Sequence, residues 1–378
     1  MQSELYKAYT NARKGKRKTL EEHIFELNDI ENIILLAKDI ASRTYEPSRS
    51  KAFIIHDPVV REIFAAPFRD RIVHHFIYNQ VSPWWERHFI EDSYSCRKDK
   101  GTLYSQKRFE HHARTASDNF KSDIFVAKLD IKNYFASLNR KKLFARAIWG
   151  LDQQFSKQKD ELYWTLRFLW KKIIFDNPTK NVEILGNKSD WLALPKEKSL
   201  FNQKPGYGIV IGNLTSQLLS NIYLDQLDRY IKFNLGYKHY GRYVDDFYII
   251  TRIEEKDKLL NDIRKIEFFL DGLDLKLHPK KQIFTNLKHG VNFTGSTLFP
   301  GYILPGKRVR QNAKKTFYNF AAGQAELESV VSYLGHMEHI NSTKFLANTF
   351  DSLGWDFEPT ENRPQAVKGP DSATQRTD

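Results

Sequence analysis

The sequence is poor in cysteine and has no long apolar run, and each absence excludes a class of protein. Its 378 residues include one cysteine, Cys96, which excludes a disulfide framework and a cysteine-rich zinc site. No apolar stretch approaches the roughly 20 residues that are needed to cross a bilayer. The opening residues contain no apolar signal segment. We therefore expect a soluble, cytoplasmic protein with no membrane partner.

Acidic residues are also in deficit. The chain contains 46 aspartate and glutamate residues against 59 lysine and arginine residues, a net charge of +13, and 14% of its residues are aromatic. Basic side chains release counterions from phosphates, and aromatic rings stack on bases, so this composition favours a nucleic-acid partner. An excess of charge also serves solubility, so composition alone leaves both explanations open.

Helical and strand-like segments do not alternate regularly, which predicts an α+β fold in about two or three parts. A basic stretch at 11–18 precedes a helix that opens with the capping-box spacing of Thr19 and Glu22. A long helix from residue 68 is expected to be interrupted at Pro83. The other expected elements are strands at 52–55 and 61–66, a strand ending at Asp130, a helix at 214–233, a hairpin at 240–251, a helix at 255–271, a strand pair near 274–284, and strand-like residues at 291–299.

Three aspartates suggest a metal site. The stretch YGRYVDDFYIIT places Asp245 and Asp246 side by side at the expected hairpin tip, and Asp130 ends an earlier strand. If the two strands are neighbours, the three carboxylates meet, and Mg²⁺ prefers such oxygen ligands. A pair of such ions catalyses phosphoryl transfer. A surface turn is the alternative, since aspartate is common in turns. However, two-residue hairpins prefer Asn-Gly or Asp-Gly, and such conflicts with local preference are typical of functional sites.

Seven short motifs in a fixed order resemble those of reverse transcriptases, between about residues 50 and 300. YVDDF resembles the Y-x-D-D box of that family. The other motifs are REIFAAPFRDRIVHH, SYSCRKDKGT, VAKLDIKNYFASL, IGNLTSQLLSNIYL, LDLKLHPKKQ and VNFTGS. IGNLTSQ is most similar to the reverse transcriptases of diversity-generating retroelements, whereas group II intron and retron enzymes have a pattern like QG-x-x-x-SP. This resemblance implies a bacterial or phage-encoded enzyme.

The resemblance also implies a right-hand polymerase, in which an antiparallel palm sheet packs on helices beside fingers and a short helical thumb. The C-terminal segment is polar and proline-containing, which is typical of disorder. The expected parts are an N-terminal basic arm and helix at 1–50, fingers at 51–120, a palm at 121–300 with a loop-rich insertion at about 176–206, a short thumb at 301–357 and a disordered tail at 358–378.

Catalytic roles are implied by the same resemblance. The groups assigned to two Mg²⁺ ions, for which Mn²⁺ is a substitute, are the side chains of Asp130, Asp245 and Asp246 and the main-chain carbonyl of Ile131. Lys280 is the expected general acid that protonates pyrophosphate, a role that requires a lowered pKa. Lys281 beside it is an equal candidate, and for both lysines an ordinary surface charge is the alternative.

Further residues are expected around the incoming nucleotide. Phe135 lies five residues after Asp130, where the family has an aromatic ring that excludes a ribose 2′-hydroxyl; a core aromatic is the alternative, as expected for Tyr134. Ile211 replaces an amide that lies against the nascent base pair in relatives, which implies error-prone copying at template adenines. The positions assigned to the triphosphate, template or backbone turn are Arg61, Arg69, Arg97, Gly212 and Gln217, and each arginine is alternatively a surface charge.

The expected reaction is RNA-directed DNA synthesis, in which deoxynucleotides are added to a primer 3′-hydroxyl. The expected partners are a structured RNA template, the cDNA product, the deoxynucleotides and a small basic helical accessory protein. Two alternative functions remain open. One is an antiphage defence reverse transcriptase that copies a dedicated noncoding RNA, and the other is an RNA-binding scaffold that has lost its chemistry. The presence of all three aspartates argues against the scaffold.

Overall fold

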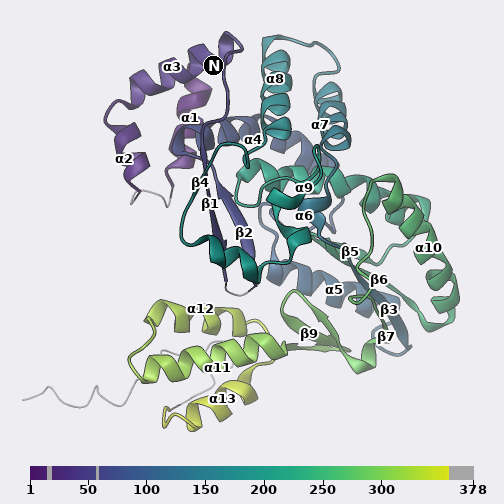
Figure 1. The fold of residues 1–378 in the computed structure, drawn as a ribbon. Helices are drawn as coiled ribbons and strands as arrows, with labels where there is room; N and C mark the ends of the chain where they lie inside the picture. The colour runs from purple at the N-terminus through teal and green to yellow at the C-terminus, as the bar shows by residue number, and fades with distance from the viewer. Residues whose placement is uncertain (15–18, 57–58, 357–378) are drawn as a thin grey trace, which may run out of the picture.

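The computed structural model describes residues 1–14, 19–56 and 59–356 and has the predicted α+β class (Figure 1). Part of the basic stretch at 11–18 and the whole tail at 358–378 lie outside the described residues. Among the described residues, no helix combines the length and the apolar character needed to span a membrane.

The N-terminal region packs three helices and a small sheet around one long helix, α4. The helices are α1 (Gln2–Ala12), α2 (Leu20–Glu26), α3 (Asp29–Ala41) and α4 (Phe68–His88). The sheet has the order β2-β1-β4, with strands β1 (Ser50–Ile55), β2 (Arg61–Ala65) and β4 (Val182–Ile184). β4 belongs to the predicted insertion at 176–206, so this insertion extends the small sheet.

The prediction that Pro83 interrupts the long helix is wrong, because α4 continues through it to His88. Proline removes one main-chain hydrogen bond and normally breaks a helix. Here Pro83 is exposed, and buried residues on either side of it, among them Val81 and Trp85, pack against the core. Tertiary packing therefore offsets the local cost.

The central sheet has the order β5-β6-β3-β7, and all its pairings are antiparallel. Its strands are β3 (Ile124–Asp130), β5 (Tyr240–Tyr243), β6 (Asp246–Arg252) and β7 (Ile283–Asn286). The helices in this region are α5 (Thr102–Ala116), α6 (Tyr134–Ser137), α7 (Arg140–Gln154), α8 (Glu161–Phe175), α9 (Leu214–Arg229) and α10 (Lys256–Gly272). The predicted strand pair at 274–284 is wrong: β7 is a single edge strand, preceded by an isolated bridge between Leu277 and Ile131.

Side chains of β3 and β6 alternate between two buried cores. Phe125 and Phe247 lie in the large core that α4, α7, α9 and α10 share, whereas Val126 and Tyr248 lie in a smaller core with α5. Successive side chains of a strand point to opposite faces. By this alternation, Asp130 shares the α5 face with Val126, at the point where the strand ends.

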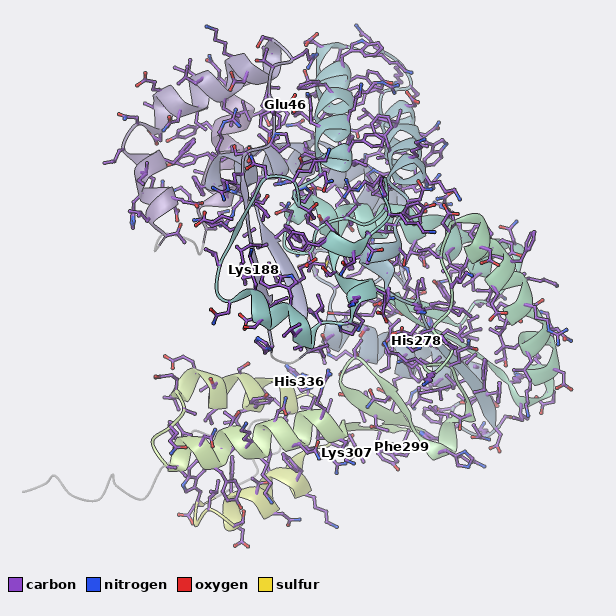
Figure 2. The ribbon with its side chains drawn as sticks, viewed as in Figure 1. Glu46, Lys188, His278, Phe299, Lys307 and His336 are labelled. Atoms are coloured by element: carbon purple, nitrogen blue, oxygen red, sulfur yellow. The ribbon has the colours of Figure 1, made fainter. Side chains whose placement is uncertain are left out.

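The C-terminal region follows a third sheet. Its order is β10-β9-β8, with strands β8 (Val291–Phe293), β9 (Ser296–Phe299) and β10 (Tyr302–Pro305). The helices α11 (Lys307–Ala321), α12 (Leu327–Met337) and α13 (Thr343–Asp351) then form a separate apolar core around Phe317 and Phe350. Figure 2 labels Lys307, the first residue of α11, which follows β10 directly. A groove lined by Gly295, Val309 and His336 lies between α11, α12 and the β8–β9 turn.

Candidate active site

Two adjacent strands of the central sheet bring the predicted aspartates to one edge. Asp130 is the last residue of β3, Asp246 is the first residue of β6, and the two are directly opposite in the antiparallel register. Residues paired in this way have Cβ atoms about 4.5–5.5 Å apart. Asp245 precedes Asp246 in the turn, and its carbonyl oxygen accepts a hydrogen bond from Ile131 N–H at 3.1 Å. Strand ends more than a hundred residues apart in sequence thus form one acidic edge.

The tip of the hairpin differs from the prediction. Tyr243 pairs with Asp246, so the two tip residues are Val244 and Asp245, not the aspartate pair. Val244 has φ +58°, the left-handed region that is unfavourable for a β-branched side chain. Its carbonyl oxygen accepts a hydrogen bond from Arg242 Nη1 at 2.8 Å. The residue that conflicts with the local preference of this turn is therefore Val244, whose main chain is strained. Such strain is concentrated at functional sites.

Two lysines neutralise part of the acidic edge. Lys281 Nζ lies 2.9 Å from Asp130 Oδ2, and Lys128 Nζ lies 3.0 Å from Asp246 Oδ1. Burial lowers the pKa of Lys281, but the hydrogen bond that it donates to Asp130 and the nearby carboxylate charges raise it more, so its pKa lies above the ordinary value. In this arrangement Lys281 holds its proton firmly.

The acidic edge still carries more negative charge than its lysines balance. Burial, with the charges of Asp130 and Asp246, raises the pKa of Asp245 to about 6. Burial also raises the pKa of Asp246, although Lys128 opposes this change. Partly buried carboxylates with raised pKa values are typical of sites that bind a cation or move protons.

These residues fit a divalent cation in charge and ligand type. All three donors are carboxylates, the ligands of hard cations, and Mg²⁺ usually needs one or two of them because water and phosphate fill the rest. Within the described ranges, no group of three or more histidine, cysteine, aspartate or glutamate side chains converges into a ready-made metal site. The strand ends that carry the aspartates therefore meet as predicted, but the carboxylates do not yet surround a common point. Lys281 contacts an oxygen of Asp130 that a cation would need.

The structure separates the two lysine candidates. His278, labelled in Figure 2, donates its N–H to the carbonyl oxygen of Asp130 at 2.7 Å, which places the following turn beside β3. Lys281 N–H closes that turn onto the carbonyl oxygen of His278 at 3.2 Å, and its side chain reaches Asp130. Lys280, which the sequence favoured equally, is exposed, as is Lys281, so the contact with Asp130 is what distinguishes Lys281.

Phe135 and Tyr134 follow Asp130 in the short helix α6. Tyr134 is buried and donates a hydrogen bond to the carbonyl oxygen of Ser220 at 2.6 Å, which confirms its expected place in the core. Phe135 is half-buried, and its ring centroid lies 5.4 Å from that of Tyr134. Its position beside Asp130 leaves the role as a sugar gate a prediction.

The three predicted arginines have different surroundings. Arg61 begins β2 and is exposed. Arg69 pairs with Asp39 at 2.7 Å, which connects α4 to α3. Arg97 is buried, with Nε 2.8 Å from Glu86 Oε2 and further donors on main-chain carbonyls. Arg69 and Arg97 therefore make structural contacts in this structure, away from the acidic edge.

The predicted template turn packs against β2. The carbonyl oxygen of Ile211 accepts a hydrogen bond from Phe64 N–H at 3.1 Å. Gly212 has φ +126°, and a Cβ at this residue would lie 3.1 Å from the carbonyl oxygen of Phe64. Glycine is therefore required there for both conformation and space. Gln217 is exposed in the first turn of α9, and Ser216 beside it is buried.

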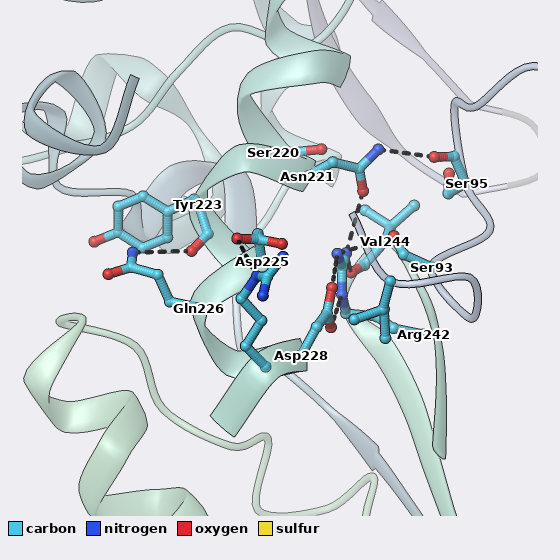
Figure 3. Close-up of polar contacts among 12 residues, drawn as sticks. Ser93, Ser95, Ser220, Asn221, Tyr223, Asp225, Gln226, Asp228, Arg242 and Val244 are labelled. Atoms are coloured by element: carbon cyan, nitrogen blue, oxygen red, sulfur yellow. Dashed lines mark hydrogen bonds and ion pairs between the residues drawn. The ribbon is translucent and has the colours of Figure 1, made fainter. Parts of the chain in front are cut away.

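A buried network behind the hairpin was not predicted from the sequence (Figure 3). Arg242 and Asp228 are both fully buried and form a bidentate ion pair with two contacts of 2.7 Å. Asn221 links this pair to the carbonyl oxygen of Ser95. The sequence does offer one indication of this network. Asp228 falls on the buried face of the expected helix, where a carboxylate needs a positively charged partner.

Comparison with known proteins gives a family match. The family described as reverse transcriptase (RNA-dependent DNA polymerase) matches residues 59–298. No curated protein sequence matches the chain.

Among solved structures, similar chains include telomerases from two yeasts. One is telomerase from Candida albicans in complex with the TWJ fragment of telomeric RNA, with a TM-score of 0.49 and 13% identity, covering 83% of this chain and 57% of that chain. Another is apo telomerase from Candida tropicalis, with a TM-score of 0.45 and 13% identity, covering 82% of this chain and 59% of that chain. The chain thus spans less than two thirds of the length of these telomerases.

Proposed function

Because the chain belongs to the reverse transcriptase family, we propose that it is an RNA-directed DNA polymerase that adds deoxynucleotides to a primer 3′-hydroxyl. The observation that carries this proposal is the direct pairing of Asp130 with Asp246 across two sheet strands, with Asp245 in the adjoining turn. That arrangement supplies the negative edge that two-metal nucleotidyl transfer needs.

The residues of the edge have distinct roles in this proposal. The carboxylates of Asp130, Asp245 and Asp246 would hold two Mg²⁺ ions, for which Mn²⁺ is an alternative, and the Ile131 carbonyl would be a further ligand. When bound, the ions supply charge neutralisation at the attacking 3′-oxygen and at the triphosphate. Lys281 leaves Asp130 in that state and carries its proton toward the pyrophosphate oxygens. The contact with Asp130 raises the pKa of Lys281, so release of that contact would lower its pKa toward the range that a general acid needs.

The rest of the chain is assigned by position. We propose fingers at 51–120, a palm at 121–300 and a thumb at 301–357, with Phe135 below the incoming sugar. Arg61 is a candidate for the triphosphate, and Ile211, Gly212 and Gln217 for the template base. The partners in this proposal are an RNA template, deoxynucleotides and the cDNA.

The proposed biological setting is a diversity-generating retroelement with a small basic accessory protein. The supporting feature is the aliphatic Ile211, which cannot make the hydrogen bonds of an amide against a nascent base pair. Errors concentrated at template adenines are the expected result. Sequencing of cDNA copied from a defined RNA tests this setting, and equal error rates at all four bases would instead favour the antiphage defence role on a noncoding RNA.

Primer extension on a defined RNA template tests the activity itself. We expect the wild type to extend the primer in Mg²⁺, and Asp130→Asn to reduce the rate by about 10²-fold or more. Asp123→Asn is the matched control, because Asp123 is a partly exposed aspartate near the other end of β3 that pairs with Lys288. An Asp130→Asn protein that extends as fast as this control contradicts the proposal.

A further inference from the structure

The guanidinium of Arg242 is saturated with hydrogen bonds inside the palm. Nε and Nη2 donate to the two oxygens of Asp228 at 2.7 Å each. Nη2 also donates to Ser93 Oγ at 3.1 Å, and Nη1 donates to Asn221 Oδ1 at 3.3 Å and to the carbonyl oxygen of Val244 at 2.8 Å. Arginine has five N–H donors, so every donor of this fully buried side chain has an acceptor.

These acceptors come from three separate parts of the chain. Asp228 and Asn221 lie on α9, Ser93 lies in the segment after α4, and Val244 is at the hairpin tip (Figure 3). The main chain of Arg242 is fixed as well, because its N–H donates to the carbonyl oxygen of Asp92 at 2.8 Å. The arginine thus joins the hairpin tip to a rigid frame.

The contact with Val244 is made at a strained residue. A β-branched residue at φ +58° prefers to return to an extended conformation. Such a change rotates the peptide between Val244 and Asp245 and moves the Asp245 side chain. Because Arg242 holds the carbonyl oxygen of that same peptide, its hydrogen bond opposes the rotation directly.

The effect of Arg242 on Asp245 is geometric more than electrostatic. Asp228 carries a full negative charge against the guanidinium, and the Tyr240 hydroxyl donates a further hydrogen bond to the same carboxylate at 2.5 Å. The pair is therefore close to neutral when seen from the hairpin tip. Its influence reaches Asp245 through the position of one peptide group.

We propose that Arg242, held by Asp228, is a positioning residue that fixes the hairpin tip in the conformation that presents Asp245 to a divalent cation. The inference rests on the proposed function for the identity of that cation. It differs from a general role in stability, because it predicts weaker cation binding in a protein that is still folded.

A second buried pair provides a matched control. Arg146 Nη2 lies 2.5 Å from Asp225 Oδ2, and Asp225 is on α9, nearly one turn before Asp228. Both pairs therefore connect an arginine to the same helix. The guanidinium of Arg146 stacks on Trp149, 3.7 Å from the ring centroid, and its ion pair is with α9 and not with the hairpin. Arg146→Lys thus perturbs a similar pair in a different place.

The test measures Mn²⁺ binding by electron paramagnetic resonance on the full chain, without nucleotide or primer, using Asp245→Asn as the baseline. We expect Arg242→Lys to raise the Kd for Mn²⁺ at least tenfold, since lysine cannot bridge Asp228 and the carbonyl oxygen of Val244. Arg146→Lys is expected to lower the melting temperature by a comparable amount and to leave the Kd within twofold of the wild type. Equal Kd values in Arg242→Lys and wild type overturn the inference.

Two further variants keep the test decisive. Val244→Gly in the Arg242→Lys background removes the strain, so part of the lost Mn²⁺ affinity is expected to return; no recovery counts against positioning. If Arg242→Lys does not fold, Asn221→Ala replaces it, because it removes one of the two acceptors that fix Nη1 beside Val244 while leaving the Asp228 pair intact. We expect a two- to fivefold rise in Kd for that variant, and an unchanged Kd overturns the inference.

Failure of the inference and failure of the proposed function give different results. A wild type that binds Mn²⁺ but extends no primer contradicts the polymerase function, and the comparison of Kd values still tests the role of Arg242. The role of Arg242 alone is contradicted by a different pair of results. In that case the wild type extends primers, and Arg242→Lys keeps both the Kd for Mn²⁺ and the Mg²⁺ concentration that gives the half-maximal rate.

Discussion

Substituting Asp245 by asparagine is expected to stabilise the metal-free protein while removing its activity. Burial, together with the charges of Asp130 and Asp246, raises the pKa of Asp245 from an ordinary value of 3.8 to about 6. One pKa unit corresponds to about 1.36 kcal/mol, so the ionised carboxylate costs the folded state about 3 kcal/mol once the pH exceeds 6. Asparagine has a similar shape and no charge, so it removes this cost.

The sign of the effect depends on pH. Below about pH 4 the carboxyl group is protonated in both the folded and unfolded states, and the substitution changes little. As the pH rises through 6, the folded wild type gives up a proton against its environment, so its stability falls relative to Asp245→Asn. For a chain of 378 residues, about 3 kcal/mol corresponds to a melting temperature about 4 °C higher at pH 8.

Thermal unfolding in a chelating buffer at pH 5 and pH 8 checks this expectation. Asp123→Asn serves as a control of opposite sign, because the hydrogen bond from Lys288 lowers the pKa of Asp123. That control is expected to lose stability at pH 8 and to approach the wild type as the pH falls. If Asp245→Asn is no more stable than wild type at pH 8, the three aspartates do not share one acidic edge.

Three other predictions concern neighbouring residues. Phe135→Val is expected to raise ribonucleotide incorporation relative to deoxynucleotide incorporation by about tenfold; an unchanged ratio in competition assays would make Phe135 a core residue. Gly212→Ala is expected to lower both the melting temperature and the extension rate more than Gly101→Ala. The two glycines have nearly the same φ, +126° and +127°, but of the two only Gly212 lies against other atoms. Equal losses in the two variants would show that crowding at Gly212 has no effect. Lys281→Ala is expected to slow single-turnover extension by about 10²-fold, while Lys280→Ala stays close to wild type, and the reverse order would reassign the proton donor.

The acidic edge was predictable because it depends on strand periodicity and on residue types that are costly elsewhere. Asp130 closes an apolar strand, and Asp245 and Asp246 interrupt two others. Antiparallel pairing of those strands is enough to bring the residues to one edge. The α+β class followed from the same segments. The exact tip was not predictable, since a one-residue shift of the turn places Val244, and not Asp246, in the loop.

Charged residues with partners in other segments were the hardest to interpret from the sequence. Arg69 and Arg97 occur in motifs that suggest phosphate contacts, yet each is held by carboxylates and carbonyls of neighbouring segments. Arg242 was passed over because a lone arginine in a strand gives no sign of a partner on a distant helix. Such contacts depend on tertiary packing, which also carried α4 through Pro83.

The two lysines of the acidic edge differ in exposure, and this difference separates their roles. The Lys128 side chain is 12% exposed and emerges from β3, so its position against Asp246 is fixed by the sheet. The Lys281 side chain is 55% exposed and lies in a turn, so it can leave Asp130 without disturbing the core. Lys281 is therefore the lysine that would give way to a cation held by these carboxylates, whereas Lys128 would stay in place. Under the proposed function, the released ammonium group would be the nearby candidate for protonating the leaving group.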